Sequence, residues 1–264
     1  MGIALVTGAS AGIGKELARC FAADRHAVVL VARRLPLLET LAGELRARSG
    51  QDAWPIACDL AAPGAVDTLL AELARRGLDI DFLVNNAGFG TTGAFADLPA
   101  EREIAMAELN VMAVARLTRA LLPGMLARGR GRVLNIGSTA GFQPGPYMAT
   151  YYASKAFVNH FSEALAEEVR GTGVTVTLSC PGPTHTEFGE VSGVGKANLF
   201  RRLPVATAER VAREAYRACF AGRVVVVHGF LNRLGALLVR LGPRSIVRRV
   251  LAFLNRPPEL GAKT

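Results

Sequence analysis

Residues 2–14 read GIALVTGASAGIG. The first six form an apolar run typical of a buried strand, glycines follow at positions 8, 12 and 14, and a helical pattern continues from Lys15 to Ala23. A strand, turn and helix of this kind can bind a pyrophosphate through backbone N–H groups and the positive end of the helix dipole. Glycine is needed in the turn because a Cβ would block the approach of the pyrophosphate. The glycine spacing differs from G-x-G-x-x-G, so the turn alone also fits an ordinary tight connection.

A second apolar strand, residues 27–32, ends at Arg33 and Arg34. In a dinucleotide-binding fold the end of this strand faces the adenosine ribose, where an acid would bind a 2′-hydroxyl and an arginine would hold a 2′-phosphate. The two arginines, with no acid beside them, therefore favour NADP(H) over NAD(H). The alternative is a pair of solvated loop charges in an arginine-rich chain.

The rest of the chain alternates predicted strands with predicted helices. Strands are expected at residues 53–57, 80–84, 131–136, 174–178 and 224–227, and helices at 35–49, 63–76, 101–126 and 151–170. This alternation predicts an α/β fold with a single doubly wound Rossmann domain over residues 1–229. Its parallel seven-stranded sheet is expected in the order 3-2-1-4-5-6-7, flanked by helices.

Three polar residues are the candidates for a reaction centre. Tyr151 and Lys155 are four residues apart, which places both on one face of a helix, and Ser138 follows the strand at 131–136. A phenol loses its proton near pH ~10, so a tyrosine that exchanges protons near neutrality needs a nearby cation, and Lys155 is placed to supply it. Because a lowering of ~3 pKa units takes roughly 4 kcal/mol, we expect the pair to lie in a cleft beside a further cation, such as a nicotinamide ring. Because Tyr and Lys at this spacing are common on ordinary helices, the pair alone does not indicate catalysis, and the interpretation depends on the other motifs.

Together these motifs resemble those of the short-chain dehydrogenase/reductase family over roughly three quarters of the chain. Further matches follow in the family's order along the sequence: Asp59 after the third strand, Asn85-Asn86-Ala87-Gly88 after the fourth, Asn110 in a helix, and Pro181-Gly182-Pro183-Thr184 followed by Thr186. The resemblance implies that Asp59 or its neighbours contact the adenine. It also implies that residues 85–88 line the cofactor and that residues 181–186 meet the nicotinamide carboxamide.

The resemblance further implies a reaction, the interconversion of a carbonyl and a secondary alcohol by hydride transfer. Tyr151 would act as the general acid or base and Ser138 would hydrogen-bond the carbonyl oxygen. Lys155 would lower the pKa of Tyr151 and bind the nicotinamide ribose, while Asn110 would complete a proton relay. The expected NADP(H)-binding residues are Gly8, Ser10, Gly12, Ile13, Gly14, Arg33, Arg34, Asp59, Leu60, Asn86, Ala87, Gly88, Tyr151, Lys155, Pro181, Gly182, Thr184 and Thr186.

The substrate is expected to be a hydrophobic small molecule or a 3-oxoacyl-type compound. Residues 187–203 occupy the place where relatives carry a mobile substrate lid, and their glycines suit such movement. Candidates for an apolar pocket are Phe89, Phe142, Met148 and Phe188. A function of another class also fits the fold, namely a regulatory protein that senses NADP(H) without turnover. The complete set of Ser138, Tyr151 and Lys155 favours the enzyme, because a sensor needs no acid.

Composition and charge indicate which further partners and sites the protein has. The chain has 264 residues, is 50% hydrophobic and carries a formal net charge of +9. Its arginines are spread along the chain without interleaved aromatic residues, which argues against a nucleic-acid partner. The scattered cysteines and histidines predict no metal site, and no apolar stretch is long enough to cross a bilayer. With a strand directly after Met1, the sequence predicts a cytoplasmic protein with reduced thiols.

Residues 230–264 are predicted to form a basic amphipathic helical extension. Apolar residues at helical spacing run from Phe230 to Leu241 and from Ser245 to Leu254, with Pro243 between the two runs and arginines among them. Two interpretations stay open. The apolar residues pack on the domain or on a second subunit, in a homodimer or homotetramer, or residues 230–254 lie on an anionic membrane surface.

Overall fold

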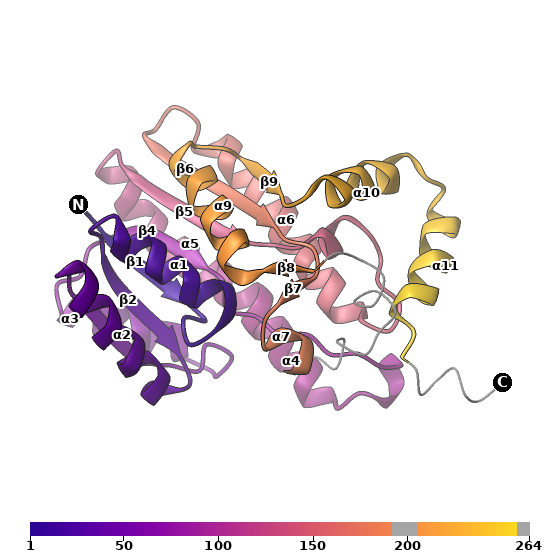
Figure 1. Cartoon of the computed structure of the whole chain (residues 1–264), viewed down its shortest axis with the longest axis horizontal. Helices are drawn as coiled ribbons and strands as arrows, with labels where there is room; N and C mark the ends of the chain where they lie inside the picture. The colour runs from indigo at the N-terminus through magenta and orange to yellow at the C-terminus, as the bar shows by residue number, and fades with distance from the viewer. Residues whose placement is uncertain (192–204, 258–264) are drawn as a thin grey trace.

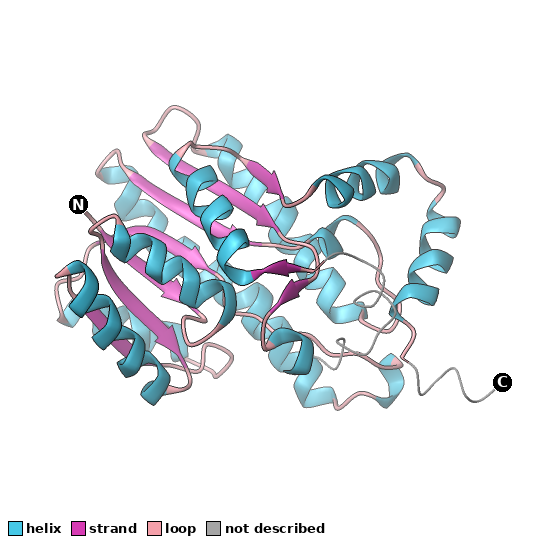
Figure 2. Cartoon of the chain, viewed as in Figure 1, coloured by secondary structure: helices cyan, strands magenta, loops and turns pink. Residues whose placement is uncertain are grey.

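A parallel sheet of seven strands runs through the protein in the order β3-β2-β1-β4-β5-β6-β9 (Figures 1 and 2). The computed structural model describes residues 1–191 and 205–257, so most of the predicted lid, residues 192–203, lies outside the described residues. The strands are β1 (Ile3–Thr7), β2 (Ala27–Ala32), β3 (Ala53–Ala57), β4 (Ile80–Asn85), β5 (Gly131–Ile136), β6 (Val174–Cys180) and β9 (Val225–Val227). The predicted strand order is confirmed. The seventh strand is β9 because β7 (Thr184–His185) and β8 (Ala206–Thr207) pair with each other outside this sheet.

Helices cover both faces of the sheet. One layer contains α1 (Gly12–Ala23), α2 (Leu35–Ser49) and α9 (Ala208–Phe220), and the other contains α3 (Ala65–Arg75), α5 (Ala113–Ala127) and α6 (Ala149–Glu168) (Figure 1). Shorter helical elements are α4 (Ala100–Ala107), α7 (Phe188–Val191), η1 (Phe95–Asp97), η2 (Glu108–Met112) and η3 (Thr139–Phe142). The last two helices, α10 (Phe230–Leu241) and α11 (Arg244–Asn255), extend beyond the sheet (Figure 1).

The central strands are apolar because both faces of the sheet are covered. Along β2, Val28 and Leu30 pack into the layer of α1, α2 and α9, whereas Val29 and Val31 pack into the opposite layer. In the first layer Phe21 is fully buried, and its ring meets that of Tyr216 edge-to-face with 4.9 Å between centroids. This two-sided core fixes the carboxyl ends of the strands, where the polar loops begin.

The helix predicted over residues 101–126 contains a π-helical turn. After α4 ends, η2 forms a π-helical turn, and α5 begins only at Ala113. A π turn adds a residue to the helical repeat without breaking the chain of hydrogen bonds, so the sequence pattern does not announce it. Asn110 lies inside this turn and is buried, and its side chain exchanges two hydrogen bonds with the backbone of Phe89, at 3.1 and 2.9 Å. Helical residues thus run without a gap from Ala100 to Ala127, close to the predicted bounds, and the π turn is the feature that the prediction lacked.

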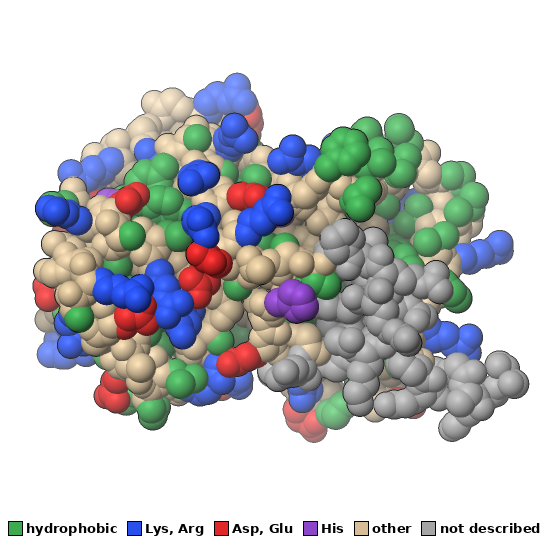
Figure 3. All heavy atoms as spheres, viewed as in Figure 1, with side chains coloured by type: hydrophobic (Ala, Val, Ile, Leu, Met, Phe, Trp, Pro, Cys, Tyr) green, Lys and Arg blue, Asp and Glu red, His purple; other side chains and the backbone are tan. Residues whose placement is uncertain are grey.

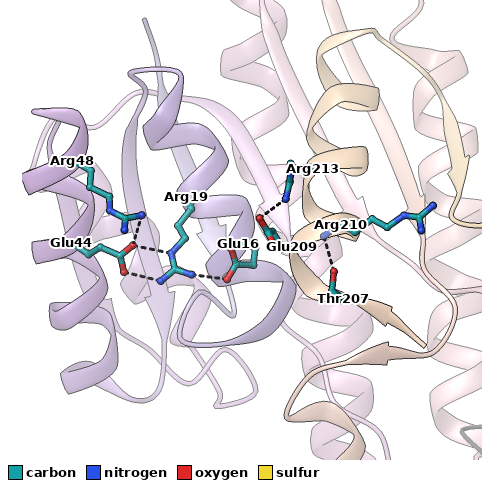
Figure 4. A network of polar contacts seen from close by, with 8 residues as sticks. All are labelled: Glu16, Arg19, Glu44, Arg48, Thr207, Glu209, Arg210 and Arg213. Carbon is teal, nitrogen blue, oxygen red and sulfur yellow. Dashed lines mark hydrogen bonds and ion pairs between the residues drawn. The ribbon is translucent and has the colours of Figure 1, made fainter. Parts of the chain in front are cut away.

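Part of the large positive charge is paired on the surface of the helical layers. Arg19 of α1 contacts Glu16 at 2.7 Å and Glu44 of α2 at 2.8 Å, and Arg48 reaches the same Glu44 at 3.3 Å (Figure 4). On α9, Arg213 pairs with Glu209 (Figure 4). Such partly exposed ion pairs contribute little to the stability of the fold.

Candidate active site

The loops that follow the parallel strands line one cavity of about 770 Å³. Its lining includes residues that follow β1, β2, β3, β4, β5 and β6, and it spans the point between β1 and β4 where the strand order reverses. Open α/β sheets bind their ligands at this kind of switch point. Of the predicted site residues, all except Gly14 and Asn110 line this cavity.

The glycine turn has the geometry that a pyrophosphate site requires. Gly8 and Gly12 have φ of 66° and 55°, a conformation that favours glycine. Gly14 lies behind the turn, where an added Cβ would come within 2.4 Å of the carbonyl oxygen of Gly8. These three glycines therefore keep the turn open on the cavity side and tightly packed on the other, which fits a dinucleotide.

Thr7 and Asn86 hold this turn against the loop after β4. The hydroxyl of Thr7 accepts hydrogen bonds from the backbone N–H groups of Asn86 and Ala87, at 2.9 and 3.0 Å. The side chain of Asn86 donates to the carbonyl oxygens of Thr7 at 2.9 Å and Gly8 at 3.3 Å. Sequence reasoning missed Thr7, whose only signal was a hydroxyl residue at the end of a buried strand.

Polar groups converge where the 2′-phosphate was predicted. Arg34 Nη2 donates to Ser10 Oγ at 3.1 Å, so the turn after β1 and the end of β2 supply neighbouring donors. The same nitrogen forms an ion pair with Glu187 Oε2 at 2.7 Å, and both side chains are about half exposed. Glu187 was predicted only as part of the lid. The structure places its carboxylate at the rim of the same cavity.

The reaction-centre candidates come together on the loop after β5 and the first turns of α6. Burial raises the pKa of Tyr151, and the neighbouring Ser138 side chain partly offsets this rise. Lys155 donates from Nζ to the carbonyl oxygen of Ile136 at 2.7 Å, and its Nζ lies 6.0 Å from the centroid of the Tyr151 ring. Burial lowers the pKa of Lys155 to about 8.

These pKa directions describe the protein without a cofactor. A lowered pKa of Tyr151 was expected from Lys155 together with a further cation, and in the protein alone the pKa of Tyr151 is raised. The reason is that burial desolvates the phenolate more strongly than any surrounding side chain stabilises it. A lowered pKa for Tyr151 would therefore require a further positive charge in the cavity.

Buried amide and hydroxyl groups hold this centre in place. Asn159, one turn after Lys155 on α6, donates to the carbonyl oxygen of Ser138 at 3.1 Å. Asn110 donates from its side chain to Ser154 Oγ at 3.0 Å, and Ser154 Oγ donates to the carbonyl oxygen of Tyr151 at 2.7 Å. Asn110 thus supports the backbone of Tyr151 from behind rather than lining the cavity. Sequence reasoning missed Asn159, which its position four residues after Lys155 could have indicated.

The remaining wall of the cavity is apolar and comes largely from α10 and α11. Its members on these helices include Leu231, Leu238, Val239, Ile246, Val250 and Leu254. Three of the four predicted pocket residues, Phe89, Met148 and Phe188, also line the cavity. The fourth, Phe142, packs instead against the buried cluster of Val114, Val158, Leu178 and Cys180. Sequence reasoning found the apolar stripes of the two helices but not that one of them faces the site.

Within the described residues, no group of three histidine, cysteine, aspartate or glutamate side chains could hold a metal ion. Ser138, Tyr151 and Lys155 place a hydroxyl, a phenol and an amine in the cavity. A partly buried phenol next to a hydroxyl can deliver a proton to an oxygen atom placed beside both groups.

Comparisons with known proteins agree with this geometry. The family model described as short chain dehydrogenase matches residues 2–194. A putative ketoacyl reductase of Streptomyces coelicolor is 41% identical over 186 residues, which cover 70% of this chain and 71% of that protein. A very-long-chain 3-oxoacyl-CoA reductase of Coprinopsis cinerea is 37% identical over 226 residues, which cover 83% of this chain. The chain spans 60% and 66% of the lengths of two fungal relatives that it matches.

The fold is also similar to solved structures over nearly its whole length. A short-chain dehydrogenase from Sphingobium yanoikuyae, solved in complex with NADPH, superposes with a TM-score of 0.82 at 32% identity. The superposition covers 94% of this chain and 97% of the Sphingobium chain.

Proposed function

The chain belongs to the short-chain dehydrogenase/reductase family of oxidoreductases, and from this premise we propose that it interconverts a carbonyl group and a secondary alcohol with NADP(H). One observation carries the proposal. Ser138, Tyr151 and Lys155 line the same cavity as the glycine turn and Arg34, so acid, cation and dinucleotide site share one space. A protein that only sensed the dinucleotide would have no need of a buried acid at that place.

The residues around the glycine turn support NADP(H) as the cofactor. The open side of the turn would receive the pyrophosphate, and Ser10 and Arg34 would donate to the 2′-phosphate. Asp59 and Leu60 line the cavity beyond β3 and would border the adenine, while Thr184 and Thr186 would border the nicotinamide. When bound, NADPH supplies the hydride that reduces the carbonyl carbon.

Side chains of the protein would supply the proton for the reduction. Tyr151, whose raised pKa keeps it protonated at neutral pH, would donate its proton to the carbonyl oxygen, and Ser138 would donate a hydrogen bond to the same oxygen. With a pKa of about 8, Lys155 is mostly protonated at pH 7 and would stabilise the phenolate left behind. Asn110, through Ser154, would keep Tyr151 in position.

The walls of the cavity support an apolar substrate. Leucine, isoleucine and valine side chains of α10 and α11 face the reaction centre, as do Met148 and Phe188. These surfaces suit a hydrophobic ketone or the chain of a 3-oxoacyl compound, because burying apolar area contributes about 25 cal/mol per Å². The 3-oxoacyl and ketoacyl names of two relatives point in the same direction.

A panel of carbonyl compounds tests the proposal directly. NADPH oxidation is followed by absorbance with 3-oxoacyl thioesters of increasing chain length, cyclic and aryl ketones, and polar ketoses as negative controls. Turnover with the apolar compounds, a kcat/KM that increases with chain length and weaker activity with NADH are expected. Tight binding of NADPH with no turnover across the panel would contradict the enzyme proposal and favour a protein that senses NADPH.

We also expect a homodimer or homotetramer. Apolar side chains are partly exposed on one side of the catalytic layer, namely Met112 of η2, Leu126 of α5 and Phe157 of α6. Phe157 stacks on Phe161 with 5.3 Å between ring centroids, which keeps its ring in place at the surface. Light scattering of the purified protein measures the oligomeric state.

A further inference from the structure

Helix α10 has an unusual surface for a helix of this composition. It has 12 residues, most of them apolar, and none is buried. Phe230, Leu234, Leu237 and Leu241 are 76%, 40%, 54% and 76% exposed. They are spaced by four, three and four residues, so they form a single line along the helix, which we call the outer stripe. The outer stripe does not border the substrate cavity.

A second apolar face of the same helix does border the cavity. It includes Leu231, Leu238 and Val239. Each residue of an α-helix is rotated by about 100° from the one before, so the centre of this inner face is turned by roughly 100° from the outer stripe. Lining the cavity therefore explains the inner face of α10 but leaves the outer stripe unexplained.

The charge around the outer stripe is of one sign. Residues 230–257 contain six arginines and no aspartate or glutamate. Arg233 and Arg240 are seven residues apart and flank the outer stripe on the side away from the cavity, while Arg244 and Arg248 are exposed on α11. Figure 3 shows hydrophobic side chains gathered over α10. This combination of a projecting apolar line and arginines is that of an interfacial helix.

We propose that the outer stripe and the arginines of α10 and α11 dock the protein on an anionic lipid surface. The apolar side chains would enter the boundary of the acyl chains, and the arginines would meet lipid phosphates. None of the described helices has the length and hydropathy of a transmembrane span. At about 1.5 Å per residue, α10 is about 18 Å long, well short of the ~30 Å hydrocarbon core, so it would lie in the plane of the surface.

Two other occupants fit less well. A second copy of this chain, related by a two-fold axis through α10, would bring arginines against arginines with no acidic residue in residues 230–257 to pair with them. A nucleic acid would satisfy the charge but would offer no apolar partner for a line of leucines and phenylalanine. A lipid surface meets both requirements, because its phosphates and acyl chains lie within a few ångströms of each other.

Vesicle sedimentation with matched variants tests the docking. The purified chain is mixed with vesicles of phosphatidylcholine alone or of phosphatidylcholine with phosphatidylglycerol, at low and at physiological salt. The outer-stripe variant is Phe230→Ser/Leu237→Ser/Leu241→Ser, the charge variant is Arg244→Gln/Arg248→Gln, and the control is Val239→Ser on the inner face, where the side chain is only partly exposed. Circular dichroism and the thermal midpoint establish that each variant is folded, so the test does not depend on finding the substrate.

The wild-type chain is expected to sediment with the anionic vesicles and not with the neutral ones, and salt should weaken its binding. Binding should fall by at least about tenfold in the outer-stripe and charge variants and stay unchanged in Val239→Ser. Absence of wild-type binding to anionic vesicles at low salt would overturn the proposal. Equal binding by the outer-stripe variant would do the same. Conversion of an oligomer into monomers by that variant, without any vesicle binding, would assign the stripe to a subunit contact instead.

Discussion

Tyr152 on α6 and Asn255 at the end of α11 are joined by a buried hydrogen bond, with 3.2 Å between the Tyr152 hydroxyl and Asn255 Oδ1. The amide group of Asn255 also donates to the carbonyl oxygen of Pro146 at 3.2 Å, and Asn255 is completely buried. We call these two bonds the clasp. Because Tyr152 directly follows Tyr151, the clasp ties the apolar wall of the cavity to the helix that carries the proposed acid.

Breaking the clasp should affect substrate binding more than cofactor binding. Asn255→Leu removes both bonds and leaves the buried Tyr152 hydroxyl without its partner, which costs about 1–3 kcal/mol of unfolding free energy. With α11 less firmly placed, KM for an apolar substrate should rise about three- to tenfold, while the Kd for NADPH stays within about twofold. Tyr152→Phe is the milder comparison, because the bond from Asn255 to Pro146 remains. An unchanged KM in Asn255→Leu would show that the clasp does not position the wall.

The ion pair of Arg34 with Glu187 should weaken NADPH binding. The 2′-phosphate would need the same guanidinium that Glu187 now holds at 2.7 Å, so Glu187→Gln should tighten NADPH binding a few-fold and leave NADH binding unchanged. Arg34→Ala should weaken NADPH binding by about tenfold or more, also without effect on NADH. Fluorescence titration of both cofactors measures these constants. Parallel changes for NADPH and NADH would place the 2′-phosphate elsewhere.

Burial of Lys155 predicts a pH-dependent stability difference. Its pKa of about 8 in the folded chain lies below the ordinary value of 10.5, so between these values the unfolded chain binds more protons at this site and the contribution of Lys155 to stability rises with pH. Below pH 8 the charged side chain costs up to about 3 kcal/mol. Lys155→Met removes this cost and also the bond to Ile136, which adds an offset independent of pH.

Urea unfolding of the wild type and of Lys155→Met, without cofactor, measures this difference. The stability of the variant relative to the wild type should be highest below pH 8 and should decline steadily up to about pH 10.5. Taking the difference cancels the titration of Cys219, which does not interact with Lys155, and a Cys180→Ser background in both proteins removes the thiol that does. A difference that stays constant over this range would mean that Lys155 is not desolvated.

Short-range patterns account for the parts of the structure that were predicted correctly. Each apolar run became a strand of the sheet because both of its faces are covered, and the two tail helices begin and end within one residue of the predicted runs. Tyr151, Lys155 and Ser138 could be grouped because a helix face and a neighbouring strand end are local features.

The features that sequence reasoning missed depend on burial or on pairs of residues far apart in the chain. Glu187 meets Arg34 across 153 positions and Asn255 meets Tyr152 across 103, distances at which no periodicity operates. The π turn at Asn110 leaves the apolar pattern of its helix nearly unchanged. Helical spacing reveals the cation next to Tyr151 but not the desolvation of Tyr151 and Lys155, which only the packing around them shows.

The central claim is that Tyr151 transfers the proton in an NADPH-dependent reduction, and the Tyr151→Phe variant tests it most directly. With a substrate identified from the panel, turnover and the Kd for NADPH are measured for this variant and for Tyr152→Phe, which removes the neighbouring hydroxyl. We predict that Tyr151→Phe binds NADPH normally and loses about 10²–10⁴-fold in kcat, whereas Tyr152→Phe loses less than about tenfold. Turnover of Tyr151→Phe close to that of the wild type would contradict the account.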